Sequence, residues 1–117
     1  MDIKGRERYI NLFDIYASLL TKKQYSYFEE YYYLDYSLQE IADLHSVSRN
    51  ACYDAINKTC KILENYEDKM HLLSKNQKLK EALDLENIDE IKNIINDVIE
   101  EWFIWLLMVY QIDFKWL

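Results

Sequence analysis

The chain has 117 residues, half of them hydrophobic, and a formal net charge of −7 at pH 7. This length suits one compact domain with a modest core and an appendage. Proline is absent and Gly5 is the only glycine, which excludes tight hairpins and phosphate-binding glycine loops. The composition therefore predicts an all-α fold.

Two helices are predicted before residue 37. Apolar side chains recur at three- and four-residue spacing over about residues 5–20, which predicts a helix with one buried face. This stripe consists of Tyr9, Leu12, Phe13, Tyr16, Leu19 and Leu20. Thr21 and Gln24 have the spacing of a capping box, so a second helix is expected to begin directly after Thr21. Its inner face is expected to carry Tyr25, Phe28, Tyr31 and Tyr32.

Six tyrosines lie within residues 25–36. Such a cluster is compatible with stacking on the bases of a single-stranded nucleic acid. We favour a core role, because half of these tyrosines fall on the predicted buried face. Proteins that stack bases also interleave aromatic side chains with more cations than Lys22 and Lys23 supply.

Residues 37–58 carry the pattern of a helix-turn-helix, two helices joined by a three-residue turn. Ser37 and Glu40 have the spacing of a capping box, which predicts the first helix over about residues 38–44. The small side chain of Ala42 permits the second helix to cross closely at this point.

The second helix of the motif is predicted over about residues 48–66, with Ser48 as its N-cap. No helix-breaking residue follows before Ser74, so the helix is expected to continue to about that position. Its outer face is expected to carry Ser48, Arg49, Asn50, Tyr53, Asp54, Asn57 and Lys58, and its inner face Cys52, Ala55 and Ile56.

The two cysteines are expected to be reduced thiols. Cys52 and Cys60 lie on one predicted helix, ~12 Å apart along its axis, which is too far for a disulfide. Their spacing is not that of a zinc site, and Cys52 is expected to be a small core residue. The sequence therefore predicts no metal site and no cofactor.

The last part of the chain is predicted to form an acidic helical extension. A helix over about residues 75–84 is followed by a polar joint, and Asn87 and Glu90 signal a further helix. Apolar residues then alternate at three and four positions, which resembles a coiled-coil seam. The seam comprises Ile88, Ile91, Ile95, Val98, Trp102, Trp105, Val109, Ile112 and Trp116.

The stretch WFIWLLMVY, residues 102–110, is apolar around the whole helix. It is short of the ~20 residues needed to span a membrane, and the helix lacks the cations typical of insertion at a membrane surface. We therefore expect a protein interface and predict a homodimer formed through Ile91, Ile95, Val98, Trp102, Trp105 and Val109. The expected domains are a helix-turn-helix domain over residues 1–75 and an oligomerising extension over residues 76–117.

Four blocks of the sequence resemble one known family: LLTKKQ (19–24), YYYLDYSLQEIA (31–42), VSRNACYDAINKT (47–59) and LENYEDKMHL (63–72). They are similar to the YlxM-type helix-turn-helix proteins of low-GC bacteria. The resemblance covers about residues 5–75 and implies a helix-turn-helix bundle similar to region 4 of sigma factors. It also implies a regulatory role and, from gene neighbourhood, a link to the signal recognition particle pathway.

The block after the turn matches the family pattern at Arg49, Tyr53 and Asp54. Asn50 stands where the family usually has glutamine, and Cys52 where it has valine. Before the turn, His45 and Ser46 replace an aromatic or aliphatic residue followed by glycine. We therefore expect His45 to be half-buried and Ser46 to adopt a turn conformation that glycine takes more easily. The chain after about residue 87 matches no part of the pattern.

The leading interpretation is a DNA-binding regulatory module. Arg49 would read guanine, and Asn50 and Asn57 would read adenine in the major groove. Tyr53, Lys58 and Lys61 would bind phosphates, and Thr21, Lys22 and Lys23 would add contacts to the DNA backbone. Ser48, at the start of the second helix, is also counted among the DNA-binding residues. The alternative for Arg49 is an ion pair with an acid elsewhere, and for Asp54 an ion pair with Lys58 is favoured.

The charge distribution limits this interpretation. Residues 1–80 hold 12 basic and 12 acidic side chains, whereas residues 81–117 hold 2 and 9. Attraction to phosphates is therefore weak, and DNA binding by a monomer should be weak as well.

The second interpretation is a protein or RNA adaptor of the protein-targeting machinery, in which the acidic and apolar C-terminal part is the active region. Catalysis is not expected, because the chain has two histidines and no nucleophile motif. A cytoplasmic location is expected, since MDIKGRERY lacks the apolar stretch of a secretory signal.

Overall fold

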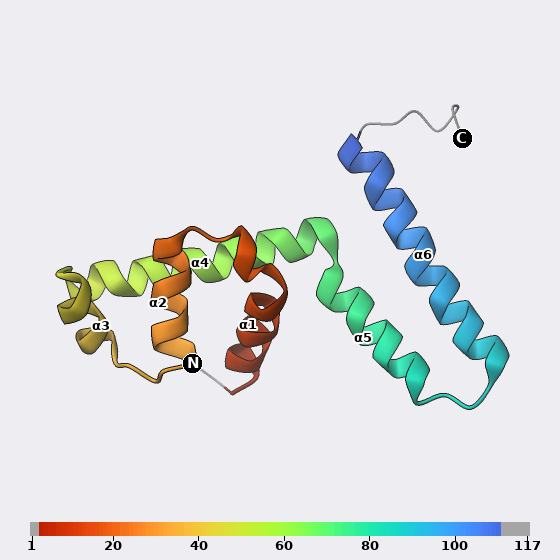
Figure 1. Ribbon diagram of the computed structural model, residues 1–117, viewed down its shortest axis with the longest axis horizontal. Helices are drawn as coiled ribbons and strands as arrows, with labels where there is room; N and C mark the ends of the chain where they lie inside the picture. Colours follow the sequence, from red (N-terminus) through yellow and green to blue (C-terminus); the bar gives the residue numbers. More distant parts are fainter. Residues whose placement is uncertain (1–2, 111–117) are drawn as a thin grey trace. The chain divides into compact units, whose positions relative to one another are not determined.

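The computed structural model describes the backbone of residues 3–110 and the side chains of residues 5–108. Within that range the chain forms helices and no strand, which confirms the all-α prediction (Figure 1). The elements are α1 (Ile3–Tyr16), the 3₁₀-helix η1 (Ala17–Leu19), α2 (Lys22–Tyr32), α3 (Leu38–His45), α4 (Arg49–Met70), α5 (Leu72–Leu83) and α6 (Ile88–Tyr110).

Two compact units divide the chain between Asp68 and Lys69. The first contains α1, η1, α2, α3 and most of α4, and the second contains α5 and α6. The domain boundary predicted after residue 75 stays a prediction.

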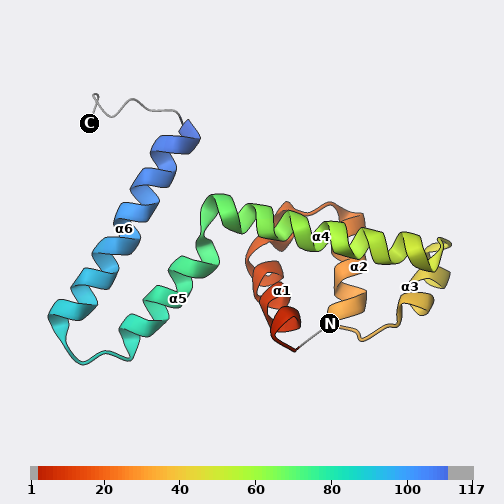
Figure 2. The same ribbon diagram turned by 180° about the vertical axis from the view of Figure 1, so that it is seen from behind.

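The core of the first unit forms where α1 and α2 lie across α4 (Figures 1 and 2). Phe28 of α2 is fully buried and stacks on Phe13 of α1 with ring centroids 4.4 Å apart. Its other side stacks on Tyr32 at 4.3 Å. Other fully buried apolar side chains in this unit include Leu12, Ile41, Ala42, Cys52 and Leu63. The apolar stripes predicted from helical spacing therefore supply this core.

The inner face of α2 was predicted in part. Phe28 and Tyr32 are buried as expected, whereas Tyr25 is 40% exposed and Tyr27 is buried in its place. The reason is that α2 packs on α3 as well as on α1. The ring of Tyr27 lies 4.5 Å from the ring of His45, so its burial depends on the tertiary position of α3.

The first helix also ends earlier than predicted. The regular α-helical turns of α1 stop at Tyr16, and the chain tightens into η1 before the cap of α2. Leu19 consequently leaves the predicted stripe and is exposed. Thr21 and Gln24 form the predicted capping box, with Gln24 N donating to Thr21 Oγ1 at 3.2 Å and Thr21 N to Gln24 Oε1 at 3.0 Å.

Polar side chains fasten α1 to the C-terminal half of α4. Tyr16 Oη donates to the buried carboxylate of Glu67 at 2.6 Å. Arg8 donates twice to Glu64, each time at 2.7 Å, and this hydrogen bonding holds the pKa of the Glu64 carboxyl below its usual value. A buried carboxylate is tolerated when such bonds replace its hydration.

The fourth helix is shorter than the sequence indicated. It ends at Met70, whereas it was expected to continue to about Ser74. His71 adopts a left-handed conformation with φ of 55°, and α5 begins at the next residue. Lys75 Nζ donates to Met70 O at 2.9 Å, which satisfies one of the carbonyls left without a partner at the end of α4. Neither glycine nor proline marks this break.

The second unit is an antiparallel hairpin of α5 and α6 (Figures 1 and 2). Asn87 caps α6 as predicted, because its Oδ1 accepts from Asp89 N at 2.9 Å and Glu90 N at 3.2 Å. Across the hairpin, the ammonium of buried Lys75 lies 4.1 Å from the ring centroid of Trp102. Lys78 forms an ion pair with Glu101.

The predicted seam of α6 faces α5 only in part. Val98 is buried, and Ile91 and Trp105 are half-buried. Trp102 contacts Lys75 of α5 although it is 37% exposed, and Ile95 is 40% exposed. The side chain of Val109, together with Ile112 and Trp116, lies outside the described residues. Ile88, the first residue of the seam, is exposed as well, and further exposed apolar side chains occur elsewhere on the helix, at Ile99, Phe103, Ile104, Leu106 and Met108. No helix in the described range is long and apolar enough to cross a membrane.

Candidate nucleic-acid interface

The helix-turn-helix is formed by α3, residues 46–48 and the first turns of α4. Ser37 Oγ accepts from Glu40 N at 3.1 Å, and Ser48 Oγ accepts from Ala51 N at 3.0 Å, so both helices begin at the predicted caps. Within the described residues Glu40 does not return a bond to Ser37, so only half of that predicted capping box forms. One side-chain cap is sufficient to fix each N-terminus.

The turn depends on a left-handed residue at Ser46. Its φ is 55° and its ψ 43°, which confirms the conformation expected where the family pattern has glycine. Val47 N donates to Ala42 O at 3.0 Å, and Ser46 N donates to Asp43 O at 3.4 Å. These two bonds are those of a Schellman motif, which closes α3 and directs the chain into α4.

Substitutions at Ser46 are expected to change stability through the backbone, because its side chain is exposed. Ser46→Val should lower the free energy of unfolding by ~1–2 kcal/mol, since a β-branched residue is strongly disfavoured at positive φ. Ser46→Gly should be neutral or slightly stabilising, because the relief of strain offsets the greater freedom of the unfolded chain. Urea denaturation measures both. Equal stability of the valine and glycine variants would contradict the left-handed turn.

A contact from α2 holds the turn in place. His45 is half-buried, as expected, and its Nε2 lies 2.8 Å from Glu30 Oε2. The ring of His45 also packs on Tyr27. Sequence reasoning missed both Tyr27 and Glu30. Their only signal was a three-residue spacing, which places them on one face of α2.

The predicted reading face of α4 is exposed. Arg49, Asn50 and Tyr53 point away from the core, and Asn57 is half-buried. Ser48, Lys58 and Lys61 are also exposed, whereas Cys52 and Ile56 are buried on the opposite face. One helix therefore presents a polar strip from Ser48 to Lys61.

Lys22 and Lys23 come from a different element. Both are exposed in the first turn of α2, and Lys23 Nζ lies 5.9 Å from the ring centroid of Tyr27. Their predicted contacts to a DNA backbone remain a prediction, as does every base or phosphate contact assigned to α4.

The charges on this surface are mixed. Arg49 forms no ion pair with any residue that the structure describes, so its guanidinium is available to a ligand. The ion pair expected between Asp54 and Lys58 is likewise not formed among the described side chains. Both residues are exposed, and hydration there competes well with a surface ion pair. Asp43 and Asp54 add negative charge near the cations.

The cysteines lie behind this surface. Cys52 and Cys60 are both free thiols and both buried. Burial was predicted for Cys52 only. Burial raises the pKa of each thiol above its ordinary value, and the Glu30 carboxylate adds to the rise at Cys52. Among the described residues, no group of His, Cys, Asp and Glu could hold a metal ion.

We expect both thiols to react slowly with a thiol reagent in the folded protein. The thiolate is the nucleophile, and a raised pKa lowers its population at neutral pH while burial blocks access. Titration with a chromogenic disulfide should give fast reaction of two thiols in denaturant and slow reaction without it. Rapid reaction of either cysteine under native conditions would contradict the buried positions.

Comparisons with known proteins agree with this geometry. A family model described as "Putative helix-turn-helix protein, YlxM / p13 like" (UPF0122) matches residues 3–102. The match therefore extends beyond the expected residues 5–75, and the expectation that nothing after about residue 87 matches the family was wrong as far as residue 102. The chain belongs to the UPF0122 family. The family's helix-turn-helix description favours a binding role over a catalytic one.

Individual relatives carry the same family name. The UPF0122 protein YofM of Lactococcus lactis subsp. lactis is 47% identical over 94 residues, which cover 77% of this chain and 85% of YofM. A UPF0122 protein of Lactococcus lactis subsp. cremoris is 49% identical over 87 residues, covering 71% of this chain and 78% of the relative. One from Streptococcus pyogenes serotype M5 is 55% identical over 74 residues, covering 63% and 66%.

Proposed function

We propose that this UPF0122 protein is a DNA-binding regulator that reads the major groove with the N-terminal part of α4. The observation that carries the proposal is the exposed polar face formed by Ser48, Arg49, Asn50 and Tyr53. This face follows directly after the turn that the two backbone hydrogen bonds of the Schellman motif close. A helix-turn-helix presents the start of its second helix to base edges in this way.

Each side chain on this face has a chemical role in the proposal. Arg49 can donate two parallel hydrogen bonds to guanine, and the amides of Asn50 and Asn57 match adenine. Tyr53, Lys58 and Lys61 contact phosphates along α4, and Ser48 contacts the backbone at the helix start. Lys22 and Lys23 add backbone contacts from α2.

Four lysines of one chain would neutralise phosphates. The logarithm of the binding constant should then fall with the logarithm of salt concentration with a slope of roughly −3 to −4. The protein as a whole is acidic, so nonspecific attraction is weak and binding depends on sequence-specific contacts. The proposal also requires a cytoplasmic location, where bacterial DNA lies.

Selection of DNA sequences from a random pool tests the proposal. The purified full chain should enrich one motif, and fluorescence anisotropy should then give the predicted salt slope. The double variant Lys58→Ala and Lys61→Ala should reduce that slope by about two, whereas Lys92→Ala on α6 is a matched exposed control and should not. Failure to enrich any motif at low salt would contradict DNA reading.

A second candidate is an adaptor that binds a protein or RNA partner of the signal recognition particle pathway. The acidic charge and the exposed apolar residues of α6 favour this function, because neither feature assists DNA binding. A heparin column at low salt separates nucleic-acid binding from an adaptor that binds a protein. Retention supports binding of DNA or RNA, and elution in the flow-through supports the protein adaptor.

A further inference from the structure

Asp54 is an exposed carboxylate in the middle of the proposed reading face, and none of the proposed DNA contacts involves it. Along α4 it lies ~6 Å after Asn50 and ~4.5 Å before Asn57, at ~1.5 Å per residue. Around the helix it lies ~40° from Asn50 and ~60° from Asn57, at ~3.6 residues per turn. All three side chains therefore share one face, and DNA that contacts both amides also lies over Asp54.

The carboxylate of Asp54 is available to a ligand. Among residues 5–108, no side chain forms an ion pair or a hydrogen bond with it, although Lys58 lies one turn further along α4. Asp43 of α3 differs, because its carboxylate accepts from Gln39 Nε2 at 2.8 Å. Both oxygens of Asp54 therefore remain open to a new donor.

The four bases differ in what they offer a carboxylate. An ionised aspartate can only accept hydrogen bonds, and phosphates repel it. In the major groove guanine presents two acceptors, thymine presents an acceptor and a methyl group, and adenine presents an acceptor beside its amine. Cytosine presents its amine alone. A carboxylate on a base-reading face consequently favours cytosine over the other three bases.

We propose that Asp54 is a specificity-determining residue that accepts a hydrogen bond from the N4 amine of cytosine. The inference rests on the proposed DNA binding of α4, and it adds one base to those that Arg49 and Asn50 read. Because Asp54 lies ~6 Å after Asn50, its cytosine lies within about two base pairs of the adenine that Asn50 reads, at ~3.4 Å per base pair. At any other base the carboxylate loses water without gaining an equivalent donor, so binding weakens.

Selection from a random pool of duplex DNA, repeated with Asp54→Asn, tests the proposal. Asparagine has nearly the same size but carries no charge, and its amide matches adenine instead of cytosine. The motif of the wild type should include a G·C pair that the motif of Asp54→Asn loses or replaces by A·T, with the other positions kept. Fluorescence anisotropy should show that replacing this pair by A·T weakens binding of the wild type roughly tenfold and that of Asp54→Asn less than about threefold.

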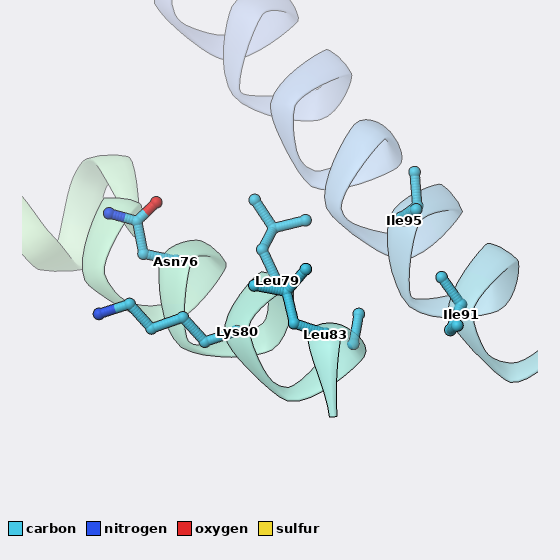
Figure 3. A pocket seen from close by; sticks show the side chains of 7 residues that line it. Asn76, Leu79, Lys80, Leu83, Ile91 and Ile95 are labelled. Atoms are coloured by element: carbon cyan, nitrogen blue, oxygen red, sulfur yellow. The ribbon is translucent and has the colours of Figure 1, made fainter. Parts of the chain in front are cut away.

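Two control variants leave the reading face intact. Asp68→Asn removes the same charge from an exposed position on the same helix, ~21 Å beyond Asp54. Leu83→Asn adds an exposed amide outside the first unit, because Leu83 lines the groove of the α5–α6 hairpin and is 83% exposed (Figure 3). Both should select the wild-type motif. Circular dichroism should give every variant the helix content of the wild type, since each changed side chain is exposed.

The positions at which the variants change the motif decide the outcome. Arg49→Ala should lose its preference at a different base pair, which separates the two reading residues. Unchanged preference at every position in Asp54→Asn would overturn the inference while DNA reading by α4 stands. Loss of the same preference in Asp68→Asn would also overturn it, because total charge would then be the cause. A wild type that enriches no motif would overturn both this inference and the proposed function.

Discussion

Phe28→Ala is expected to lower the free energy of unfolding by about 3–5 kcal/mol. Phe28 is fully buried and stacks on Phe13 and Tyr32, so its removal loses apolar burial and two ring contacts and leaves a cavity. Because these rings join α1 to α2, the cavity cannot close without moving a helix. Urea denaturation followed by circular dichroism measures the change.

Tyr36→Ala serves as the control for this prediction. Tyr36 lies just after α2 and is exposed, so its truncation should change the free energy of unfolding by less than about 1 kcal/mol. Similar losses for the two variants would mean that the aromatic cluster is not the centre of the first unit.

Arg49→Ala is expected to weaken specific DNA binding by about 1–3 kcal/mol, if Arg49 reads a base. A bidentate contact to guanine is lost, and no other exposed residue at the start of α4 can donate in the same geometry. Binding to unrelated DNA should change less, because only one charge is removed. Fluorescence anisotropy with the selected site and with a scrambled duplex gives both values.

The variant Arg49→Lys distinguishes hydrogen bonding to a base from the attraction between a positive charge and the DNA phosphates. Lysine keeps the cation but cannot form the planar pair of hydrogen bonds, so it should restore nonspecific binding more fully than specific binding. Neither variant should change the thermal stability, since Arg49 lies outside the core. Full specific affinity in the alanine variant would remove Arg49 from the reading role.

The parts of the fold that local chemistry determines were predictable. Thr21, Ser48 and Asn87 begin their helices as expected, because a side-chain oxygen that accepts from the helix N-terminus acts within a few residues of sequence. The left-handed turn at Ser46 could be anticipated for a similar reason. It follows from a family pattern that places glycine there, and the backbone requirement persists when the residue changes.

Features set by tertiary contacts could not be predicted. His71 interrupts the long helix without a helix-breaking residue, and Lys75 supports the break from the next helix. Buried Tyr27 packs on His45 of α3, and buried Glu67 accepts a hydrogen bond from Tyr16 of α1. Periodicity reports which face of a helix is apolar, but not how many neighbours the helix has.

The sequence was sufficient to predict which side chains of the candidate interface are exposed. Helical spacing separated exposed Arg49, Asn50 and Tyr53 from buried Cys52 and Ile56, and the structure places them so. The local ion pair at Asp54 was not predictable, because hydration and weak charge interactions nearly balance at an exposed site. Which bases this surface contacts is determined by how the protein docks on DNA, and the sequence of the protein alone does not determine that geometry.

Mapping of amide chemical shifts during titration with the selected duplex DNA tests the central claim most directly. If α4 enters the major groove, the largest shifts should occur from Ser48 to Lys61, with smaller ones at Lys22 and Lys23. Amides of α5 and α6 should change little at constant protein concentration. Shifts confined to α6, or none at all with a duplex that the protein retains, would contradict DNA reading by the helix-turn-helix.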